Sequence, residues 1–246
     1  MMSGATATVA AKAWRDRADA VDWDSVAADL DRYGCGLTGP LLTPAEAAEI
    51  AGLYDDGGRF RATIDMARHR FGEGEYRYFR EPLPEAVAGL RQALYPRLLP
   101  VARDWWGRLG RDASWPDSLG EWLAMCHDAG QARPTPLLLK YGAGDWNALH
   151  QDLYGELAFP FQAVTVLERP GRDFQGGEFV LLEQRPRAQS RAHVAPLRRG
   201  GFLIFTTRQR PVRGSRGVYR PAVTVLMPWR TAERRTTLGI IFHDAA

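Results

Sequence analysis

The C-terminal half of the sequence, from Pro134 onward, is a series of short apolar runs rich in β-branched residues. Clusters of Gly, Pro and Arg separate these runs at short intervals, as turns separate strands. Six or more short strands with turns at this spacing predict an all-β sandwich or barrel. The runs cover Leu137–Tyr141, Phe159–Leu167, Glu178–Leu182, Gly201–Thr206, Tyr219–Met227 and Thr236–His243.

The N-terminal half carries helix signals instead. Thr43 and Glu46 form a capping box around Pro44, which occupies the first helical position, so a helix is expected from there to about Tyr54. The predicted fold class is therefore α+β, with a helical N-terminal half packed on the β-rich half. Further helices are expected over residues 21–33, 85–109 and 118–130, and short strands or irregular structure over 59–83.

The organisation of the chain favours one folded unit. It has no internal repeat and no linker rich in Ser or Gly, and 246 residues are enough for one sizeable core. We therefore expect a single domain over residues 21–246, made of a helical support (21–133) and a β core (134–246). The Ala-rich start, residues 1–20, is expected to be a flexible tail.

Composition limits the possible partners and location. The net charge of +3 comes almost entirely from arginine, because Lys12 and Lys140 are the only lysines, and so mild an excess is weak evidence for a polyanionic partner. Two cysteines, Cys35 and Cys126, exclude a disulfide framework and are expected to be buried. There is no run of 18 apolar residues and no secretory signal at the start, so a cytoplasmic protein that does not enter a membrane is expected.

The stretch Leu137–Asp152 holds the clearest candidate chemistry. After an apolar run and a turn at Gly142–Gly144, it places His150 and Asp152 two residues apart. On a β-strand such residues project to the same face, so an imidazole and a carboxylate would lie side by side. They supply two of the three ligands in the facial triad that binds non-haem Fe(II). Because His-x-Asp also arises by chance, the surrounding sequence has to decide.

Four longer segments carry a family resemblance. They are RFRATIDMARHRFGEGEYRYF, CHDAGQARPTPLLLKYGAGDWNALHQDLYGE, GGEFVLLEQRPRAQSRA and TLGIIFHDA. In this order they resemble the double-stranded β-helix (jelly roll, cupin-like) of the Fe(II)- and 2-oxoglutarate-dependent oxygenases. More narrowly, the chain is similar, from about residue 21 to its end, to a bacterial oxygenase family related to prolyl hydroxylases and described as acting on damaged nucleic acid.

The resemblance implies roles for five residues. His150 and Asp152 would bind Fe(II), and Tyr141 would donate its hydroxyl to the cosubstrate 2-oxoglutarate. Arg235 would form the bidentate salt bridge to the distal carboxylate of 2-oxoglutarate, because a planar guanidinium matches a carboxylate. Thr237 would lie beside it, since positions 235 and 237 share one face of a strand. The implied activity is the oxidation of a C–H bond by dioxygen.

The chain departs from the family at the third metal ligand, which is a histidine on the penultimate strand. Counting back from Arg235 leads to Val225, and a second register leads to Gln209, so neither position is a histidine. Losing this imidazole is expected to weaken Fe(II) binding by at least the ~10–100-fold typical of losing a ligand's supporting partner. The remaining histidines are weak substitutes: His69, His127, His193 and His243.

Three functions remain open. The first is an oxygenase with an incomplete triad that acts on an unidentified small molecule, for example in a biosynthetic pathway. The second is a repurposed or non-oxidative binding protein on the same fold, which Val225 and Gln209 favour. The third is a nucleic-acid oxidative demethylase with a basic groove. Candidate basic segments for that groove, or simply solvated loops, are residues 185–191, 198–199, 208–220 and 230–235.

Four further residues near the proposed site have two interpretations each. Glu156 and Glu178 are either substrate-orienting groups or ordinary polar residues. Trp146 and Tyr154 either wall the pocket or belong to the core.

Overall fold

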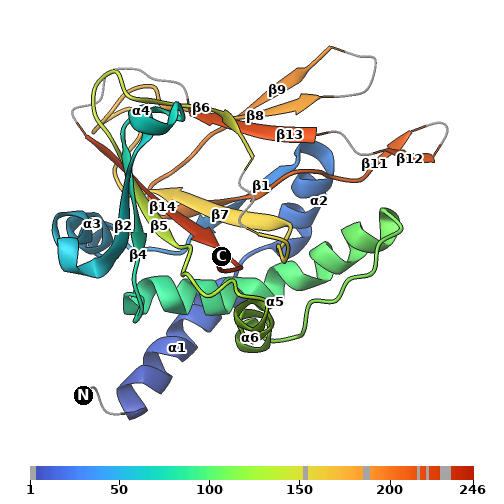
Figure 1. Ribbon diagram of the computed structural model, residues 1–246, viewed down its shortest axis with the longest axis horizontal. Coiled ribbons are helices and arrows are strands. Elements are labelled where there is room, and N and C mark those ends of the chain that lie inside the picture. Colours follow the sequence, from blue (N-terminus) through green and yellow to red (C-terminus); the bar gives the residue numbers. More distant parts are fainter. Residues whose placement is uncertain (1–3, 152–154, 185–188, 215–216, 220–221, 228–233) are drawn as a thin grey trace.

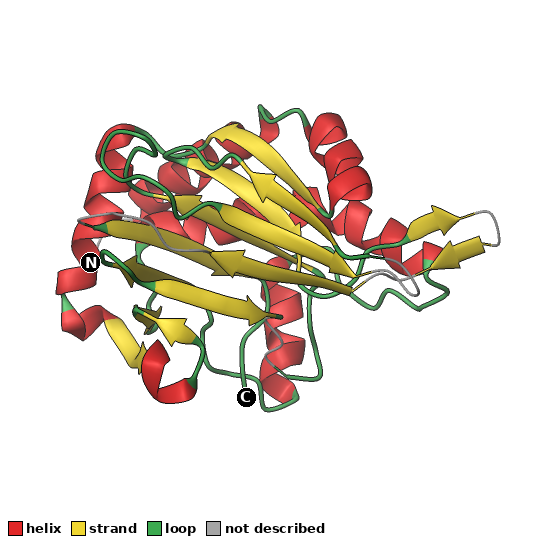
Figure 2. Ribbon diagram, turned by 90° about the horizontal axis from the view of Figure 1, so that it is seen from above, coloured by secondary structure: helices red, strands yellow, loops and turns green. Residues whose placement is uncertain are grey.

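The computed structural model describes residues 4–151, 155–184, 189–214, 217–219, 222–227 and 234–246. Two antiparallel sheets face each other, and helices pack on the outer side of the larger sheet (Figure 1). Seen from above, the smaller sheet lies over the larger one (Figure 2). The helices are α1 (Gly4–Asp19), α2 (Trp23–Tyr33), α3 (Pro44–Gly52), α4 (Met66–His69), α5 (Glu85–Arg108) and α6 (Leu119–Asp128).

From β5 onward, most successive strands alternate between the two sheets, as in a jelly roll. In spatial order the larger sheet contains β1 (Cys35–Pro40), β10 (Gly201–Thr206), β7 (Phe161–Val166), β14 (Arg235–Ile241), β5 (Leu137–Tyr141), β4 (Glu75–Phe79) and β2 (Phe60–Asp65). The smaller sheet contains β3 (Gly72–Glu73), β6 (Trp146–His150), β13 (Ala222–Met227), β8 (Phe179–Gln184) and β9 (Arg191–Ala195). A separate hairpin pairs β11 (Val212–Gly214) with β12 (Gly217–Tyr219). The β-rich C-terminal half predicted from the sequence is confirmed.

The predicted division at residue 133 is too simple, because the N-terminal half also contributes strands. β1 pairs with β10, and the β2–β4 hairpin continues the sheet beyond β5. β1 and β2 are thereby the two edge strands of the larger sheet. The N-terminal half is therefore part of the sheet as well as its helical support.

A flexible tail was predicted over residues 1–20, but the second half of α1 packs against the main core, so the prediction is wrong for that part. Trp14 and Ala18, one helical turn apart on α1, are 7% and 1% exposed and belong to the main core. Gly89 of α5 makes this contact possible, because a Cβ there would lie 2.2 Å from the Trp14 ring. Arg17 also donates to the Glu46 carboxylate over 2.8 Å and so joins α1 to α3.

Side-chain caps begin four of the helices, including α4, where Asp65 accepts from the backbone N–H of Ala67. The capping box of Thr43 and Glu46 is present at α3 as predicted, and Ser118 begins α6 with a second one. The N-cap of α2 is Asp22, which accepts from the backbone N–H of Ser25 over 3.1 Å.

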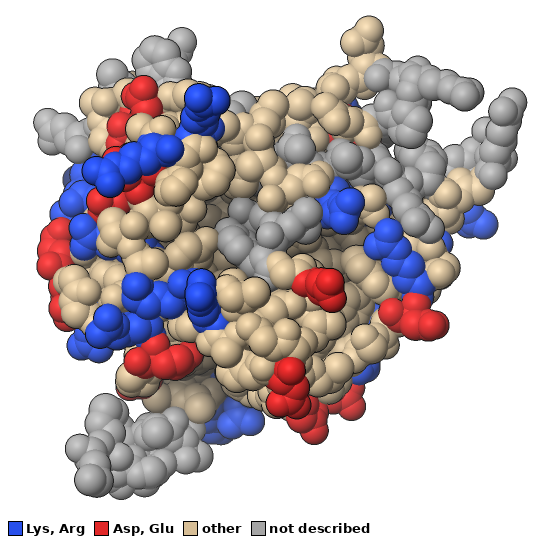
Figure 3. Space-filling model, in the orientation of Figure 1, with Lys and Arg blue, Asp and Glu red and all other residues tan. Residues whose placement is uncertain are grey.

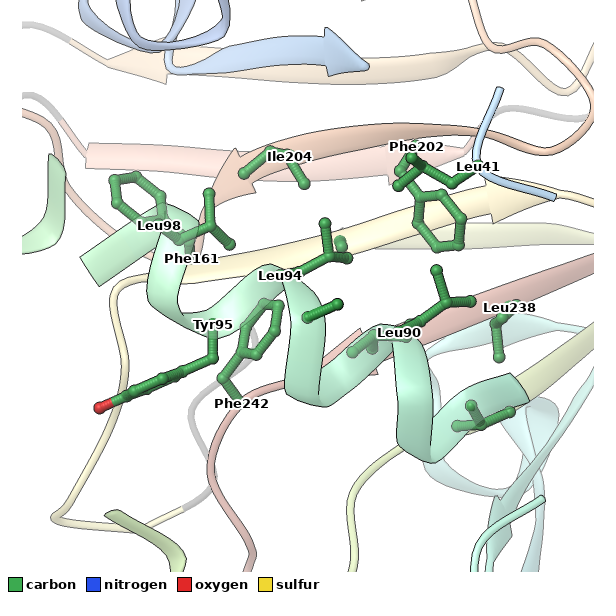
Figure 4. Close-up of a cluster of buried hydrophobic side chains, with 14 of the residues drawn as sticks. Leu41, Leu90, Leu94, Tyr95, Leu98, Phe161, Phe202, Ile204, Leu238 and Phe242 are labelled. Atoms are coloured by element: carbon green, nitrogen blue, oxygen red, sulfur yellow. The ribbon is translucent and has the colours of Figure 1, made fainter. Parts of the chain in front are cut away.

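The core has two parts, one on each side of the larger sheet. α5 packs its apolar stripe on the outer face of that sheet (Figure 4). Its contacts include Leu90, Leu94 and Leu98 from the helix and Phe161, Phe202, Ile204 and Leu238 from the strands. A second cluster fills the space between the two sheets and includes Leu139, Tyr141, Phe179, Leu181 and Phe205. Because side chains alternate along a strand, the residues of β14 that flank Leu238 face this inner space.

Both cysteines are buried, as expected. Burial raises the pKa of Cys35 to about 12, and it also raises that of Cys126. We predict that a thiol reagent at pH 8 leaves both residues unmodified in the folded protein and modifies both in denaturant, because the thiolate is the reactive form. Mass spectrometry measures this directly, and rapid modification of Cys35 in buffer would contradict it. Within the described residues, no helix is long and apolar enough to cross a membrane.

Candidate cosubstrate and metal site

The inner face of the larger sheet brings together three of the residues singled out from the sequence. β14 and β5 are antiparallel, with Arg235 directly opposite Tyr141 and Thr237 opposite Leu139. The Arg235 guanidinium carbon lies 5.8 Å from the centre of the Tyr141 ring. The side chains of Tyr141, Arg235 and Thr237 are all buried, and Arg235 is only 3% exposed. The strand alternation that predicted a shared face for Arg235 and Thr237 thus places them in the space between the sheets.

The loop before β8 closes over this arginine, a contact that the sequence did not reveal. The Phe174 ring lies 5.5 Å from the Arg235 guanidinium carbon. Gly177 has a φ of +65°, and a Cβ there would lie 2.7 Å from Nη1 of Arg235. The only signal in the sequence is the pair Gly176–Gly177, because a backbone that approaches a side chain this closely requires glycine.

Burial of the guanidinium has an electrostatic cost. It lowers the pKa of Arg235, and Tyr141, Glu168 and Glu178 act in the opposite direction. Since an arginine remains charged even when buried, a bound anion would stabilise this side chain. Thr237 adds a hydroxyl that is buried and, within the part of the chain described, has no hydrogen-bond partner. The two groups fit the carboxylate of a small ligand.

His150 ends β6 and is half-buried in the smaller sheet. Its Nδ1 lies 2.7 Å from the carbonyl oxygen of Ala148. A ring that donates from Nδ1 to a carbonyl carries its lone pair on Nε2, which is the state a metal ligand needs. Asp152 lies outside the described residues. Within those residues, no group of three or more His, Cys, Asp or Glu side chains is placed to hold a metal ion.

The strand register identifies the residue opposite His150. Val225 of β13 is the backbone partner of His150 on one side and of Leu181 on the other. Gln209 instead follows β10 in the other sheet, and its side chain accepts from Arg111 over 3.2 Å. Of the two positions considered for the missing ligand, Val225 is therefore the one across from His150.

The remaining histidines lie elsewhere. His193 is the partner of Leu181, three strands away from His150, and at ~4.8 Å per strand this is about 14 Å. His69 is exposed and stacks on Phe71, and His127 contacts Asp244 over 2.9 Å. The buried His243 accepts from the backbone of Phe159. The register thus removes His193 as a substitute ligand, and the other three have structural contacts.

The other residues considered near the site have different positions. Glu156 and Glu178 are exposed, and only Glu178 is near enough to Arg235 to affect its pKa. Trp146 is half-buried at the start of β6, and Tyr154 lies outside the described residues. Glu168, which the sequence did not suggest, accepts from the Thr236 backbone over 2.7 Å and so braces β14 beside Arg235.

Comparison with solved structures gives the class to which this architecture belongs. A prolyl-4-hydroxylase from Pseudomonas putida matches with a TM-score of 0.52 and 15% sequence identity, covering 91% of this chain and 99% of that one. An oxidoreductase of the 2-oxoglutarate–Fe(II) oxygenase family from Burkholderia pseudomallei matches with a TM-score of 0.52 and 16% identity, covering 91% and 92%. The fold is therefore the double-stranded β-helix of 2-oxoglutarate- and Fe(II)-dependent oxygenases, as the resemblance implied.

Sequence comparison then identifies the family. Residues 74–245 match the model of the Oxygenase-NA family, described as "Oxygenase, catalysing oxidative methylation of damaged DNA", and the chain belongs to this family. The uncharacterized protein Rv2227 of Mycobacterium tuberculosis is 58% identical over 165 residues, which cover 67% of this chain and 71% of that protein. The expected family is thereby confirmed.

Proposed function

We propose that this protein is an oxygenase that uses Fe(II) and 2-oxoglutarate to oxidise a C–H bond of its substrate. The observation that carries the proposal is the buried pair of Arg235 and Tyr141 on the inner face of the β-helix. Beside it lies the Thr237 hydroxyl, which has no hydrogen-bond partner among the described residues. A buried, charged guanidinium flanked by hydroxyl groups suits the distal carboxylate of 2-oxoglutarate. The family assignment supports the same cosubstrate.

The protein's own residues would bind and orient the cosubstrate. Arg235 would hold the distal carboxylate through two parallel hydrogen bonds, and Tyr141 and Thr237 would donate their hydroxyl groups to it. Phe174 and the close approach of Gly177 would limit how far the guanidinium can move and exclude water from it. These contacts would orient the bound cosubstrate in the space between the two sheets.

His150 and Asp152 would hold the metal, and they are an incomplete set. Bound Fe(II) would supply the oxidation of substrate by dioxygen, coupled to decarboxylation of 2-oxoglutarate to succinate. With Val225 across from His150, only two protein ligands are proposed, so the chelating cosubstrate would contribute an unusually large share of the binding energy. Fe(II) is therefore expected to bind more tightly when 2-oxoglutarate is present.

The proposal is tested by anaerobic titration of the metal-free protein with Fe(II) and then 2-oxoglutarate. We expect the weak visible charge-transfer band of the chelate at one equivalent. Replacing Val225 with histidine is expected to raise the affinity for Fe(II) by at least ~10–100-fold, because it restores an imidazole across from His150. Val194→His is the matched control, since this strand residue is 54% exposed and lies on β9.

The possible outcomes separate the hypotheses. A band in the wild type supports the oxygenase, and succinate release with candidate substrates is the next assay. A band that appears only with Val225→His would favour the repurposed binding protein, which has kept the cosubstrate pocket but lost the ability to bind the metal. If neither protein shows a band, the oxygenase proposal is wrong.

The substrate is proposed to be a small molecule, with nucleic acid as the second candidate. On the face shown in Figure 3, basic and acidic side chains are interspersed, whereas a nucleic-acid groove would present a continuous basic surface. The family description favours the second candidate, since it names damaged DNA. Binding to single-stranded DNA that weakens steeply with salt would support nucleic acid.

A further inference from the structure

A surface pocket lies where the edges of the two sheets meet, on the far side of the β-helix from His150. It is a shallow depression lined by Arg32, Tyr33, Leu181, Glu183, Arg191 and His193. Tyr33 ends α2 just before edge strand β1, and His193 lies on β9, the edge strand of the other sheet. The pocket thus draws on three segments that are distant in the sequence.

Three groups that can carry positive charge gather around the ring of Tyr33. The His193 ring stacks on it at a centroid distance of 4.6 Å and an angle of 13°. The guanidinium carbon of Arg32 lies 5.1 Å from the same ring centre, and that of Arg191 lies 5.9 Å from it. Each group is therefore within 6 Å of one point, and the tyrosine holds them together.

Arg32 and Arg191 differ from two nearby arginines, which form ion pairs with carboxylates. Arg108 pairs with Asp31, and the buried Arg210 pairs with Glu183 over 2.5 Å at the base of the pocket. Within the described part of the chain, neither Arg32 nor Arg191 has a carboxylate partner, and both are exposed. Since Arg210 already neutralises Glu183, these two guanidinium groups give the pocket an excess of positive charge.

We propose that this pocket binds a phosphate group, carried either by a small molecule or by a nucleic-acid strand. Two guanidinium groups supply paired N–H donors that match phosphate oxygens, and His193 adds a third donor when it is protonated. The pocket is about 14 Å from His150 across the smaller sheet, so it would anchor a ligand at a distance from the metal. This inference does not depend on the proposed oxygenase activity.

The pKa of His193 can report whether a phosphate is bound in this pocket. Burial lowers the pKa of His193, Arg191 lowers it further, and Asp29 of α2 opposes them. The other charged groups that face the ring are Arg32, on α2, and the Glu183–Arg210 pair, in which Glu183 belongs to β8. A dianionic phosphate between the arginines would favour the imidazolium and raise the pKa of His193.

The test follows the His193 resonance by NMR during pH titration of the metal-free full-length protein. The probes are inorganic phosphate, thymidine 5′-monophosphate and a ten-residue thymidine oligonucleotide without terminal phosphates, each against chloride at equal ionic strength. We expect at least one probe to raise the pKa of His193. Arg32→Gln and Arg191→Gln should each weaken that probe's binding by about tenfold, as expected for one charge-assisted hydrogen bond.

Arg15→Gln is the matched control, because this exposed residue of α1 makes the same change in net charge far from the pocket. A response to the phosphate and the monophosphate identifies a small-molecule source, and a response to the oligonucleotide alone identifies the nucleic-acid backbone. The proposal is overturned if no probe moves the pKa of His193, or if Arg15→Gln weakens binding as much as Arg191→Gln. Thermal melting of each variant verifies that it is folded.

Discussion

Replacing Asp244 with alanine is expected to lower the free energy of unfolding by about 3–5 kcal/mol, the typical cost of breaking a buried ion pair. Asp244 follows β14 and accepts from Arg91 of α5 over 2.7 Å, with side chains only 4% and 2% exposed. Arg91 also donates to the carbonyl of Ile241 over 2.8 Å. Without the carboxylate, the guanidinium charge stays buried between the helix and the sheet. Thermal melting should show a decrease of about 10 °C.

The same measurement on Asp16→Ala is the control. Asp16 pairs with Lys12 at the same distance of 2.7 Å, but these side chains are 59% and 70% exposed, so the change should stay within about 0.5 kcal/mol. The double variant Arg91→Met with Asp244→Leu should recover much of the loss, because it removes both buried charges. Equal destabilisation by Asp244→Ala and Asp16→Ala would show that the Arg91 pair does not hold the helix to the sheet.

Replacing Arg235 with glutamine is expected to weaken 2-oxoglutarate binding by at least about 100-fold, since it removes two charge-assisted hydrogen bonds. Arg235→Lys should retain part of the affinity, because the charge remains and the planar fork is lost. Thr237→Val should cause a smaller loss, since it removes one hydroxyl and keeps the shape of the side chain. Isothermal titration calorimetry of the Fe(II)-loaded protein without oxygen measures each effect.

Arg234 provides the control for this series. It is adjacent in sequence and carries the same charge, but its side chain is 41% exposed and points to Asp55 at 3.6 Å. Arg234→Gln should leave the 2-oxoglutarate affinity within about twofold of the wild type, as expected for an exposed pair. If Arg235→Gln binds 2-oxoglutarate as well as Arg234→Gln does, the assignment of the cosubstrate site is wrong.

Local sequence signals determined much of the secondary structure and the identity of the proposed site residues. The capping box at Thr43 and the apolar stripe of α5 depend on residues within a few turns of each other, so they can be recognised without the fold. The same applies to the shared face of Arg235 and Thr237, because strand alternation is a local rule. The weak strand β9 was not recognised, since its residues are mostly exposed and show no apolar alternation.

Which distant segments meet depends on the pairing of strands in the folded protein. Strand order and register place Val225 opposite His150, and they place His193 three strands away from His150. The fold also brings Gly177 against the Arg235 side chain. Residues that are far apart in the chain become neighbours through pairing of whole strands, and a shift of one residue would turn every side chain to the other face. The residue types and their local spacing therefore define the groups available for chemistry, and the sheet register defines which of these groups lie close enough to act together.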